Sequence, residues 1–386
     1  MVARGRVTAD ATAFARLLAM LAEAGDTPDE PIPVAIETNR GLWVPALRAT
    51  GRAIYPIDPL SASRYRARYQ VSGAKSDATD AVLLANILRT DAAAHRPLPA
   101  GTELAQAIRV LARARQDAVW ARQQLGNQVR ALLKDFYPAA LDAFAGLPEG
   151  GLARRDARTI LTAALTPPQA ARLTPARLRG LLAKAGRRRN IDRDIDPLRG
   201  IFRAAYLRPP PQVETAMGIQ LTALLRQFDA AFAAADELAE AAIAHFERHP
   251  DAKIITSFPG LGNLAGARVL AEIGDDRTRF TDARELKAYA GSAPITRASG
   301  KKTVVLHRHI KNRRLAAIGP IWALSSLRAS PGARCHFDAR RPAGDWNHQA
   351  QRDLFNKFLG QLHHCLQTGQ CYDEHLAFPP PPALAA

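Results

Sequence analysis

The 386-residue chain is poor in cysteine, in long apolar runs and in acidic residues. Its three cysteines, Cys335, Cys365 and Cys371, are too few and too clustered for a disulfide framework, so we expect a reducing cytoplasm. No apolar run approaches the ~20 residues that a membrane-spanning helix needs, and the N-terminus has no apolar signal segment. These absences argue against a secreted protein and against a membrane protein.

The shortage of acidic residues leaves a strongly basic chain. Lys and Arg number 53 against 36 Asp and Glu, which gives a formal net charge of +17. A polyanionic nucleic acid is the commonest partner of such a chain, although a membrane surface or an acidic protein could also attract it. With 47% hydrophobic residues, a chain of this length is expected to form two or three globular domains. Charge alone does not separate DNA from RNA.

One motif, Lys75-Ser76-Asp77-Ala78-Thr79-Asp80-Ala81, begins a predicted amphipathic helix. Asp77 and Asp80 are three residues apart, so both carboxylates lie on one face of the first turn. A helix N-terminus favours acidic side chains even where no chemistry occurs. Two adjacent carboxylates are also the ordinary way to bind a hard divalent ion such as Mg²⁺. The motif by itself is compatible with both interpretations.

A third carboxylate lies at the end of a predicted strand. The β-branched run from Pro33 to Ile36 predicts a buried strand with Glu37 at its carboxyl end. Helices and strands are then expected to alternate, with helices at 11–24, 42–49 and 59–69 and a strand at 52–57. A carboxylate at a strand end and two on a later helix are typical of ribonuclease-H-like sites that transfer phosphoryl groups with Mg²⁺ or Mn²⁺.

Two long helical patterns, 102–136 and 212–247, dominate the middle of the chain. The second has a heptad pattern, which fits either a dimerising coiled coil or an intramolecular hairpin of the two helices. Basic residues that suit contact with a nucleic-acid backbone, and equally a solvated surface, are Arg64, Arg66 and Arg68 among tyrosines and the run Arg187, Arg188 and Arg189.

A glycine-rich turn precedes the helix predicted from Leu264 to Ile273. Gly260 and Gly262 permit a tight turn into a helix N-terminus whose free N–H groups can bind phosphate. The segment suits a helix-hairpin-helix, or a plain helix corner. Further along, Ser299 precedes a glycine and a basic segment that includes Lys301 and Lys302. A serine nucleophile needs such positive charge, but Ser-Gly is also a common turn.

Near the C-terminus, five potential zinc ligands lie close together in the sequence: His363, His364, Cys365, Cys371 and His375. Their spacing fits no standard zinc finger, and a buried helix explains the segment better.

Together these motifs resemble the DEDD insertion-sequence transposases, in the order found in that family. The segments 35–38 and 75–81 resemble its N-terminal domain, and residues 252–328 resemble its C-terminal domain. The resemblance implies a RuvC-like domain in which Glu37, Asp77 and Asp80 correspond to the last three acidic residues. The first Asp has no counterpart, and Met1 to Val7 resembles the strand after the family's first hairpin. We therefore expect a truncated domain that lacks its first strand and one metal ligand, with the missing segment encoded in frame upstream.

The resemblance also implies a mechanism and partners. Ser299 would be the nucleophile that joins covalently to DNA, with Mg²⁺ or Mn²⁺ at the acidic residues. A guide RNA would pair with the DNA, and dimers or tetramers would join one chain's acidic domain to another's serine domain. The expected localisation is the cytoplasm, in association with the nucleoid.

The predicted fold has three parts and a tail: an α/β RuvC-like domain at 1–98, a helical, basic linker with a coiled-coil-like helix at 99–250, a small α-helical transposase domain at 251–378, and a tail at 379–386. The predicted function is DNA transposition with a serine nucleophile. The alternatives are a RuvC-like metal nuclease without serine chemistry, and an inactive DNA-binding remnant.

Overall fold

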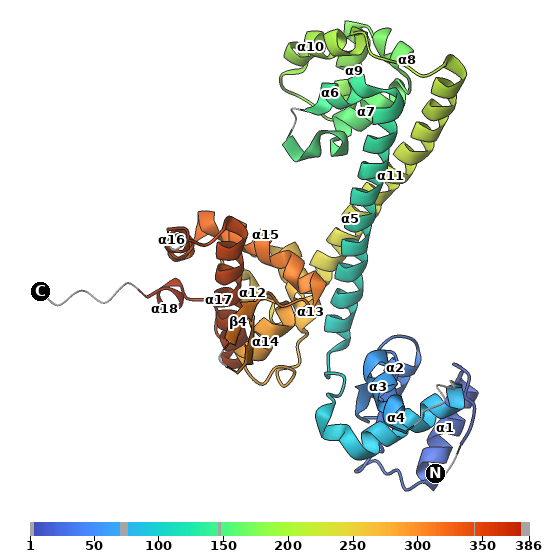
Figure 1. The fold of residues 1–386 in the computed structure, drawn as a ribbon, viewed down its shortest axis with the longest axis vertical. Coiled ribbons are helices and arrows are strands. Elements are labelled where there is room, and N and C mark those ends of the chain that lie inside the picture. Colours follow the sequence, from blue (N-terminus) through green and yellow to red (C-terminus); the bar gives the residue numbers. More distant parts are fainter. Residues whose placement is uncertain (1–3, 70–75, 146–147, 301, 343, 380–386) are drawn as a thin grey trace, which may run out of the picture. The chain divides into compact units, whose positions relative to one another are not determined.

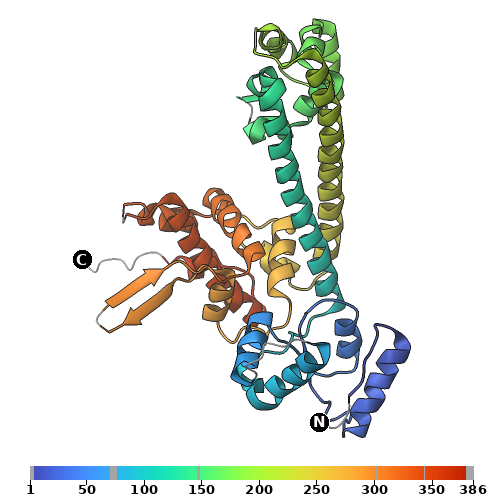
Figure 2. The same ribbon diagram turned by 45° about the vertical axis from the view of Figure 1, so that its right-hand side comes forward.

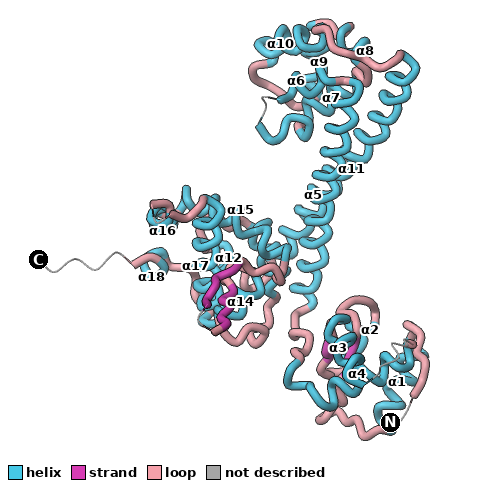
Figure 3. Tube along the Cα trace, viewed as in Figure 1, coloured by secondary structure: helices cyan, strands magenta, loops and turns pink. Residues whose placement is uncertain are grey.

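The computed structural model describes residues 4–69, 76–145, 148–300, 302–342 and 344–379 (Figure 1). The chain divides into two compact units, residues 1–100 and 101–386. The second unit therefore contains both the predicted linker and the predicted C-terminal domain. Helices predominate over strands in the described residues (Figure 3). None of these helices is long and apolar enough to cross a membrane.

The first unit alternates helices with two short strands. Its elements are α1 (Ala11–Glu23), β1 (Val34–Ile36), α2 (Trp43–Ala49), β2 (Ile54–Pro56), α3 (Pro59–Tyr69), α4 (Asp77–Asp91) and the 3-10 helix η1 (Ala92–Ala94). The strands are parallel, with Val34 opposite Ile54 and Ile36 opposite Pro56. Parallel strands need a crossover connection, and α2 lies within it. The predicted order of helices and strands is confirmed.

A small apolar core holds α3 against α4. Ile57, Ala62, Tyr65, Leu83 and Ile87 are its buried members. The start of α4 is fixed by a capping box, in which Ser76 Oγ accepts from the Thr79 N–H and Thr79 Oγ1 accepts from the Ser76 N–H.

One prediction for this unit is wrong. The described residues 4–7, which were expected to form a strand, lie in irregular structure. A strand needs a neighbour to satisfy its backbone groups, and the two strands that the described residues of this unit form pair with each other.

Two long helices form the axis of the second unit. They are α5 (Glu103–Phe136) and α11 (Pro211–Glu247), and they pack along each other (Figures 1 and 2). Leu221, Leu225, Phe228 and Ala235, which lie on the heptad seam of α11, are buried. The heptad is thus used within one chain, as in the intramolecular alternative.

Between these helices the chain forms a helical insert, residues 138–203. Its elements are α6 (Pro138–Ala145), the 3-10 helix η2 (Pro148–Ala153), α7 (Arg155–Ala163), α8 (Pro167–Ala171), α9 (Pro175–Lys184) and α10 (Ile191–Arg203). Aromatic rings at its centre join it to the end of α5, since the Phe202 ring lies 6.4 Å from Tyr137 and 6.5 Å from Phe144 between centroids.

The C-terminal part of the unit is a helical cluster with one β-hairpin. Its elements are α12 (Ala252–Thr256), α13 (Asn263–Ile273), α14 (Ala283–Ala290), β3 (Ile295–Ser299), β4 (Lys302–Leu306), α15 (Arg313–Ala329), α16 (Pro331–Arg340), α17 (Asn347–Thr368) and α18 (Glu374–Ala377). Trp322 is fully buried and stacks on Phe358 with 5.1 Å between ring centroids.

The prediction of an all-helical C-terminal domain is therefore wrong in one element. β3 and β4 are antiparallel, and Figure 2 shows them extending away from the helices around them. Every residue of β4 is exposed.

Candidate functional site

The predicted acidic residues lie on the elements that the sequence indicated. Glu37 directly follows β1 and is exposed. Asp77 and Asp80 are in the first turn of α4, where Asp77 is exposed and Asp80 is half-buried. The carboxylate of Asp80 forms an ion pair with the guanidinium of Arg66 on α3.

These carboxylates do not form a metal-binding group in this structure. Within the described ranges, no three His, Cys, Asp or Glu side chains are placed so that they could bind one metal ion. Asp80 contacts a cation of its own chain, Arg66. The predicted Mg²⁺ or Mn²⁺ site thus stays a prediction, and the zinc hypothesis gains no support: His363 faces the carbonyl oxygen of Phe280 at 3.3 Å.

The arginines that were predicted to contact nucleic acid differ in their exposure to solvent. Arg64 and Arg68 are exposed on α3, and the Arg68 guanidinium lies 5.7 Å from the Tyr65 ring centroid.

In the helical insert, Arg187 is half-buried and pairs with Asp194 and Asp156 of the same chain. Arg188 and Arg189 are exposed next to it. The exposed arginines of both sets are therefore better placed for contact with a nucleic acid than Arg66 and Arg187.

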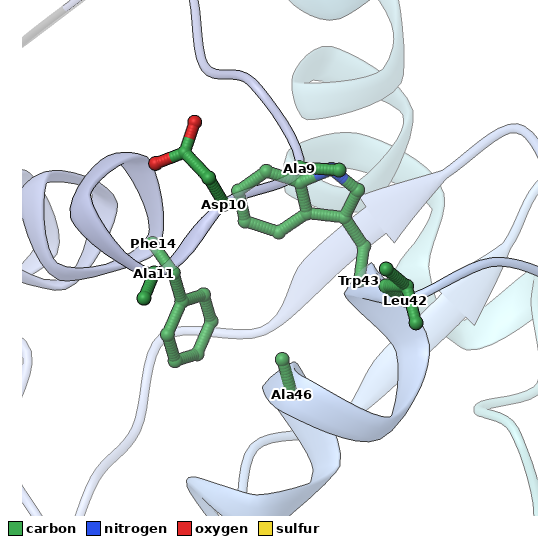
Figure 4. Close-up of a pocket in the computed structure, with 7 residues that line it drawn as sticks. All are labelled: Ala9, Asp10, Ala11, Phe14, Leu42, Trp43 and Ala46. Atoms are coloured by element: carbon green, nitrogen blue, oxygen red, sulfur yellow. The ribbon is translucent and has the colours of Figure 1, made fainter.

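A cavity of about 310 Å³ lies between the start of α1 and α2. Figure 4 shows the rings of Phe14 and Trp43 in its lining, and their centroids are 5.9 Å apart. Asp10 at its rim caps α1, because its carboxylate accepts from the Ala13 N–H at 2.8 Å. The pKa of Asp10 is lowered mainly by two hydrogen bonds: the one from the Thr8 hydroxyl has the larger effect, and the one from the Ala13 N–H the smaller. The cavity is mainly apolar and includes none of the predicted catalytic residues.

Ser299 is the last residue of β3, at the tip of the hairpin. It is exposed and opposite Lys302, and Gly300 begins the turn with φ +56°, a conformation that favours glycine. Lys301 lies outside the described residues. No described side chain forms a hydrogen bond with the Ser299 hydroxyl, so no group of the described chain activates it here.

Two other serines in the C-terminal part of the chain have structural roles. The buried Ser292 donates to Asn356 Oδ1 at 2.8 Å. Ser257 donates to the Ile254 carbonyl oxygen at 2.6 Å and accepts from the Tyr372 N–H at 2.8 Å. Because both hydroxyls are engaged, Ser299 is the best placed of the three for attack on an external phosphate.

The glycine-rich turn packs against α15. Gly260 has φ +81°, and a Cβ at this position would lie 2.5 Å from the Ser326 backbone nitrogen. Gly260 is therefore required by packing. Gly262 is exposed, caps α13 without a side-chain bond, and faces open space. The α13 N-terminus thus keeps the open N–H groups that phosphate binding needs.

A buried polar network at the junction of α5, α13 and α15 was not predicted from the sequence. Glu272 accepts from Arg113 Nε and Nη2 at 2.9 and 2.7 Å and from Asn312 Nδ2 at 2.7 Å. Burial would raise the pKa of Glu272, but the hydrogen bonds from Arg113 and Asn312 outweigh burial and lower it. A Glu inside the apolar stretch from Leu264 to Ile273 was the available signal, since a buried charge needs a partner.

Two family models match the parts of the chain that contain the candidate acidic residues and the candidate serine. A DEDD family model described as a transposase matches residues 1–138, and a model described as "Transposase IS116/IS110/IS902 family" matches residues 252–337. The first match includes Glu37, Asp77 and Asp80, and the second includes Ser299 and the glycine-rich turn.

The chain is also similar to whole proteins. It is 60% identical over 380 residues to a Streptomyces coelicolor protein named "Mini-circle putative transposase for IS117", covering 98% of this chain and 92% of the relative. It is 29% identical over 375 residues to the "Insertion element IS900 uncharacterized 42 kDa protein" of Mycobacterium paratuberculosis, covering 95% and 90%. These similarities define the class as a transposase of an insertion element. The chain belongs to the IS110 family of insertion-sequence transposases.

Proposed function

We propose that this transposase cuts and rejoins DNA through a covalent intermediate on Ser299. The observation that carries the proposal is the position of this serine. It lies exposed at the tip of a projecting hairpin, opposite Lys302, and its hydroxyl is not engaged by the described chain. A hydroxyl buried among helices could not approach the backbone of a DNA duplex, whereas one at a hairpin tip can.

The chemistry is an exchange of phosphodiesters. The Ser299 oxygen attacks a DNA phosphorus, so that a serine–phosphorus bond forms and the bond to one deoxyribose oxygen breaks. The serine proton passes to solvent, and the leaving oxygen takes a proton. A hydroxyl of the strand to be joined then attacks the same phosphorus and gives up its proton to solvent. The bond from phosphorus to the Ser299 oxygen breaks, Ser299 takes up a proton, and a DNA phosphodiester is restored. Each step exchanges one phosphodiester for another, so no external energy source is needed.

Ser299 still needs a base and a stabilised leaving oxygen. The family resemblance assigns Mg²⁺ or Mn²⁺ to Glu37, Asp77 and Asp80, and it implies a guide RNA and a dimer or tetramer. Among the described residues of one chain these three carboxylates are not placed to bind one ion. A metal bound by them would help to activate the serine or to stabilise the leaving oxygen, and it stays part of the proposal.

The test is detection of the covalent intermediate. The full chain, with any RNA that copurifies with it and with Mg²⁺, is incubated with labelled DNA spanning an end of its element, and then denatured in detergent. We expect labelled protein from the wild type and none from a Ser299→Ala variant. Thr303→Ala is the matched control, because Thr303 is another exposed hydroxyl on the same hairpin and should keep the adduct.

Other outcomes support the alternatives. Cleaved DNA without labelled protein would indicate a hydrolytic nuclease and overturn the serine mechanism. Binding without cleavage or adduct would indicate a DNA-binding remnant. Repeating the reaction after ribonuclease treatment tests the guide RNA separately, since its loss should remove the adduct and leave the protein folded.

A further inference from the structure

At the base of the hairpin, side chains from three segments meet at one imidazole. His307 follows β4, Lys311 precedes α15, and Arg352 is on α17. Lys311 Nζ lies 2.8 Å from His307 Nε2, and Arg352 Nη1 lies 3.2 Å from His307 Nδ1. The ring of His309 packs edge-on against that of His307 with 5.5 Å between centroids. These four residues are called the hairpin-base cluster below.

The cluster has too many hydrogen-bond donors. Lysine and arginine donate and never accept, and a neutral imidazole has one acceptor nitrogen. One ring nitrogen of His307 therefore bears a hydrogen that faces a cationic donor. Protonation would add a further charge, and the pKa of His307 is lowered by burial and by the charges of Lys311, Arg352 and His309. What the cluster lacks is an acceptor with negative charge.

The described chain does not supply this acceptor. Neither Lys311 nor Arg352 forms an ion pair with a carboxylate among the described residues. The adjacent acidic residue, Asp353, accepts from His336 Nε2 at 2.9 Å and lies 3.6 Å from Arg340 Nε. The Asp353 carboxylate thus hydrogen-bonds to His336 and lies near Arg340, whereas the charge of Arg352 acts on it without a hydrogen bond or an ion pair between the two.

The cluster is held in place by the packed helices. Lys311 lies across Gly291, the residue that ends α14 with φ +73°, and a Cβ at position 291 would be 2.1 Å from Lys311 Cδ. The Asn312 N–H donates to the Tyr289 carbonyl oxygen at 2.8 Å, which fixes the backbone next to Lys311. Side chains that are already ordered lose less entropy when they bind a ligand.

We propose that the hairpin-base cluster binds a backbone phosphate of the DNA strand that Ser299 attacks. A phosphate offers acceptor oxygens and negative charge to Lys311 and Arg352, and it removes the conflict at His307. The choice of strand rests on the proposed function of Ser299.

The hairpin sets the spacing between the two sites. Ser299 is opposite Lys302, and His307 is five residues beyond Lys302, which is about 17 Å along an extended strand. Phosphates of one strand of a duplex are about 3.4 Å apart along the axis. A hairpin lying along that axis would therefore bring the cluster to a phosphate about five nucleotides from the attacked one. The same distance excludes His307 as the base that deprotonates Ser299 of its own chain.

The first experiment measures duplex DNA affinity against salt concentration. Lys311→Gln and Arg352→Gln should each lower the slope of log K against log salt by about 0.9, the value for one phosphate contact. Arg313→Gln is the matched control, because Arg313 is exposed beside Lys311, forms no ion pair among the described residues, and changes the net charge equally. Thermal unfolding of each variant shows whether it is folded, and the second variant serves if the first is not.

The second experiment locates the contact. Neutral methylphosphonate linkages are placed one at a time along the DNA. When the neutral linkage is about five nucleotides from the attacked phosphate, the wild type should bind less tightly. The loss should equal the loss that Lys311→Gln shows on unmodified DNA. The same linkage should not weaken binding by Lys311→Gln any further.

Three results would overturn the proposal: cluster variants that match Arg313→Gln, a methylphosphonate effect that is equal in wild type and Lys311→Gln at every position, or a loss confined to duplex RNA. These binding measurements do not need the Ser299 adduct. If the adduct is absent and the variants still change the slope, the phosphate site stands and the serine mechanism fails.

Discussion

At the scale of single residues, the many arginines of the chain can occupy carboxylates that would otherwise bind a metal ion. Asp80 is one of two carboxylates in the first turn of α4, yet its side chain pairs with Arg66, and each side chain of the pair is 18% exposed. A divalent cation at Asp80 would have to compete with this guanidinium for the same oxygens. The pair thus opposes metal binding in the isolated chain.

Replacing Arg66 by Gln should tighten Mn²⁺ binding. A partly exposed ion pair contributes about 0.5–1 kcal/mol, so its removal should lower the Kd for Mn²⁺ by about two- to five-fold in a calorimetric titration. Arg64→Gln on the same helix is the control, since Arg64 is exposed and its loss should leave the Kd unchanged. An unchanged Kd in Asp77→Asn/Asp80→Asn would refute the acidic metal site altogether.

At the scale of secondary-structure elements, the Glu272 network joins helices that are distant in sequence. Glu272 of α13 binds Arg113 of α5 and Asn312 at the start of α15, and its side chain is 3% exposed. Because α5, α13 and α15 each contribute a side chain to this buried network, the network holds the end of the long helix α5 against the C-terminal helices that carry the hairpin. Losing one partner would leave the others without a counter-charge.

A Glu272→Gln variant should lower the free energy of unfolding by about 2–3 kcal/mol, because the amide cannot accept both bonds from Arg113 as a charged group does. Urea unfolding followed by tryptophan fluorescence measures this, since Trp322 is buried nearby. Glu237→Gln, an exposed position on α11, is the control and should change little.

The same variant should also alter the pH dependence. The pKa of Glu272 is lowered in the folded protein, so the unfolded chain binds more protons in acid. Its contribution is complete above the unfolded pKa of about 4.3 and is lost as the pH falls through the folded value. The difference between wild type and Glu272→Gln should shrink below about pH 4.3. A constant difference down to acid unfolding would contradict this role.

The elements also show what the sequence can and cannot specify. The α4 start was predictable because Ser76 and Thr79 form a local capping box, and α11 because its heptad is long. The β3–β4 hairpin is not predicted from the sequence, because Ser299-Gly300 is weighed there as a catalytic motif or a turn without strands on either side. The same residues with the β-branched Val304 and Val305 indicate a two-residue hairpin turn. The pairs Arg66–Asp80 and Arg113–Glu272 depend on tertiary packing and have no local signal.

At the scale of the whole molecule, the positive charge is unevenly distributed. Residues 1–100 contain 12 Lys and Arg and 10 Asp and Glu, which leaves 41 and 26 in residues 101–386. The second unit therefore carries a net charge of +15 and the first only +2. The predicted acidic residues and the predicted nucleophile are divided in the same way, with Glu37, Asp77 and Asp80 in the first unit and Ser299 in the second.

This division predicts that residues 101–386 alone keep most of the affinity for nucleic acid. The unit has its own two apolar cores, so the fragment should unfold cooperatively by circular dichroism. Its binding to duplex DNA should weaken steeply with salt, with nearly the slope of the full chain, because phosphate contacts release counterions. Residues 1–100 should bind weakly and with a shallow slope, and they should keep whatever Mn²⁺ binding the full chain has. If the folded 101–386 fragment shows a flat plot of log K against log salt, or if residues 1–100 account for the slope of the full chain, the main nucleic-acid surface lies outside the second unit.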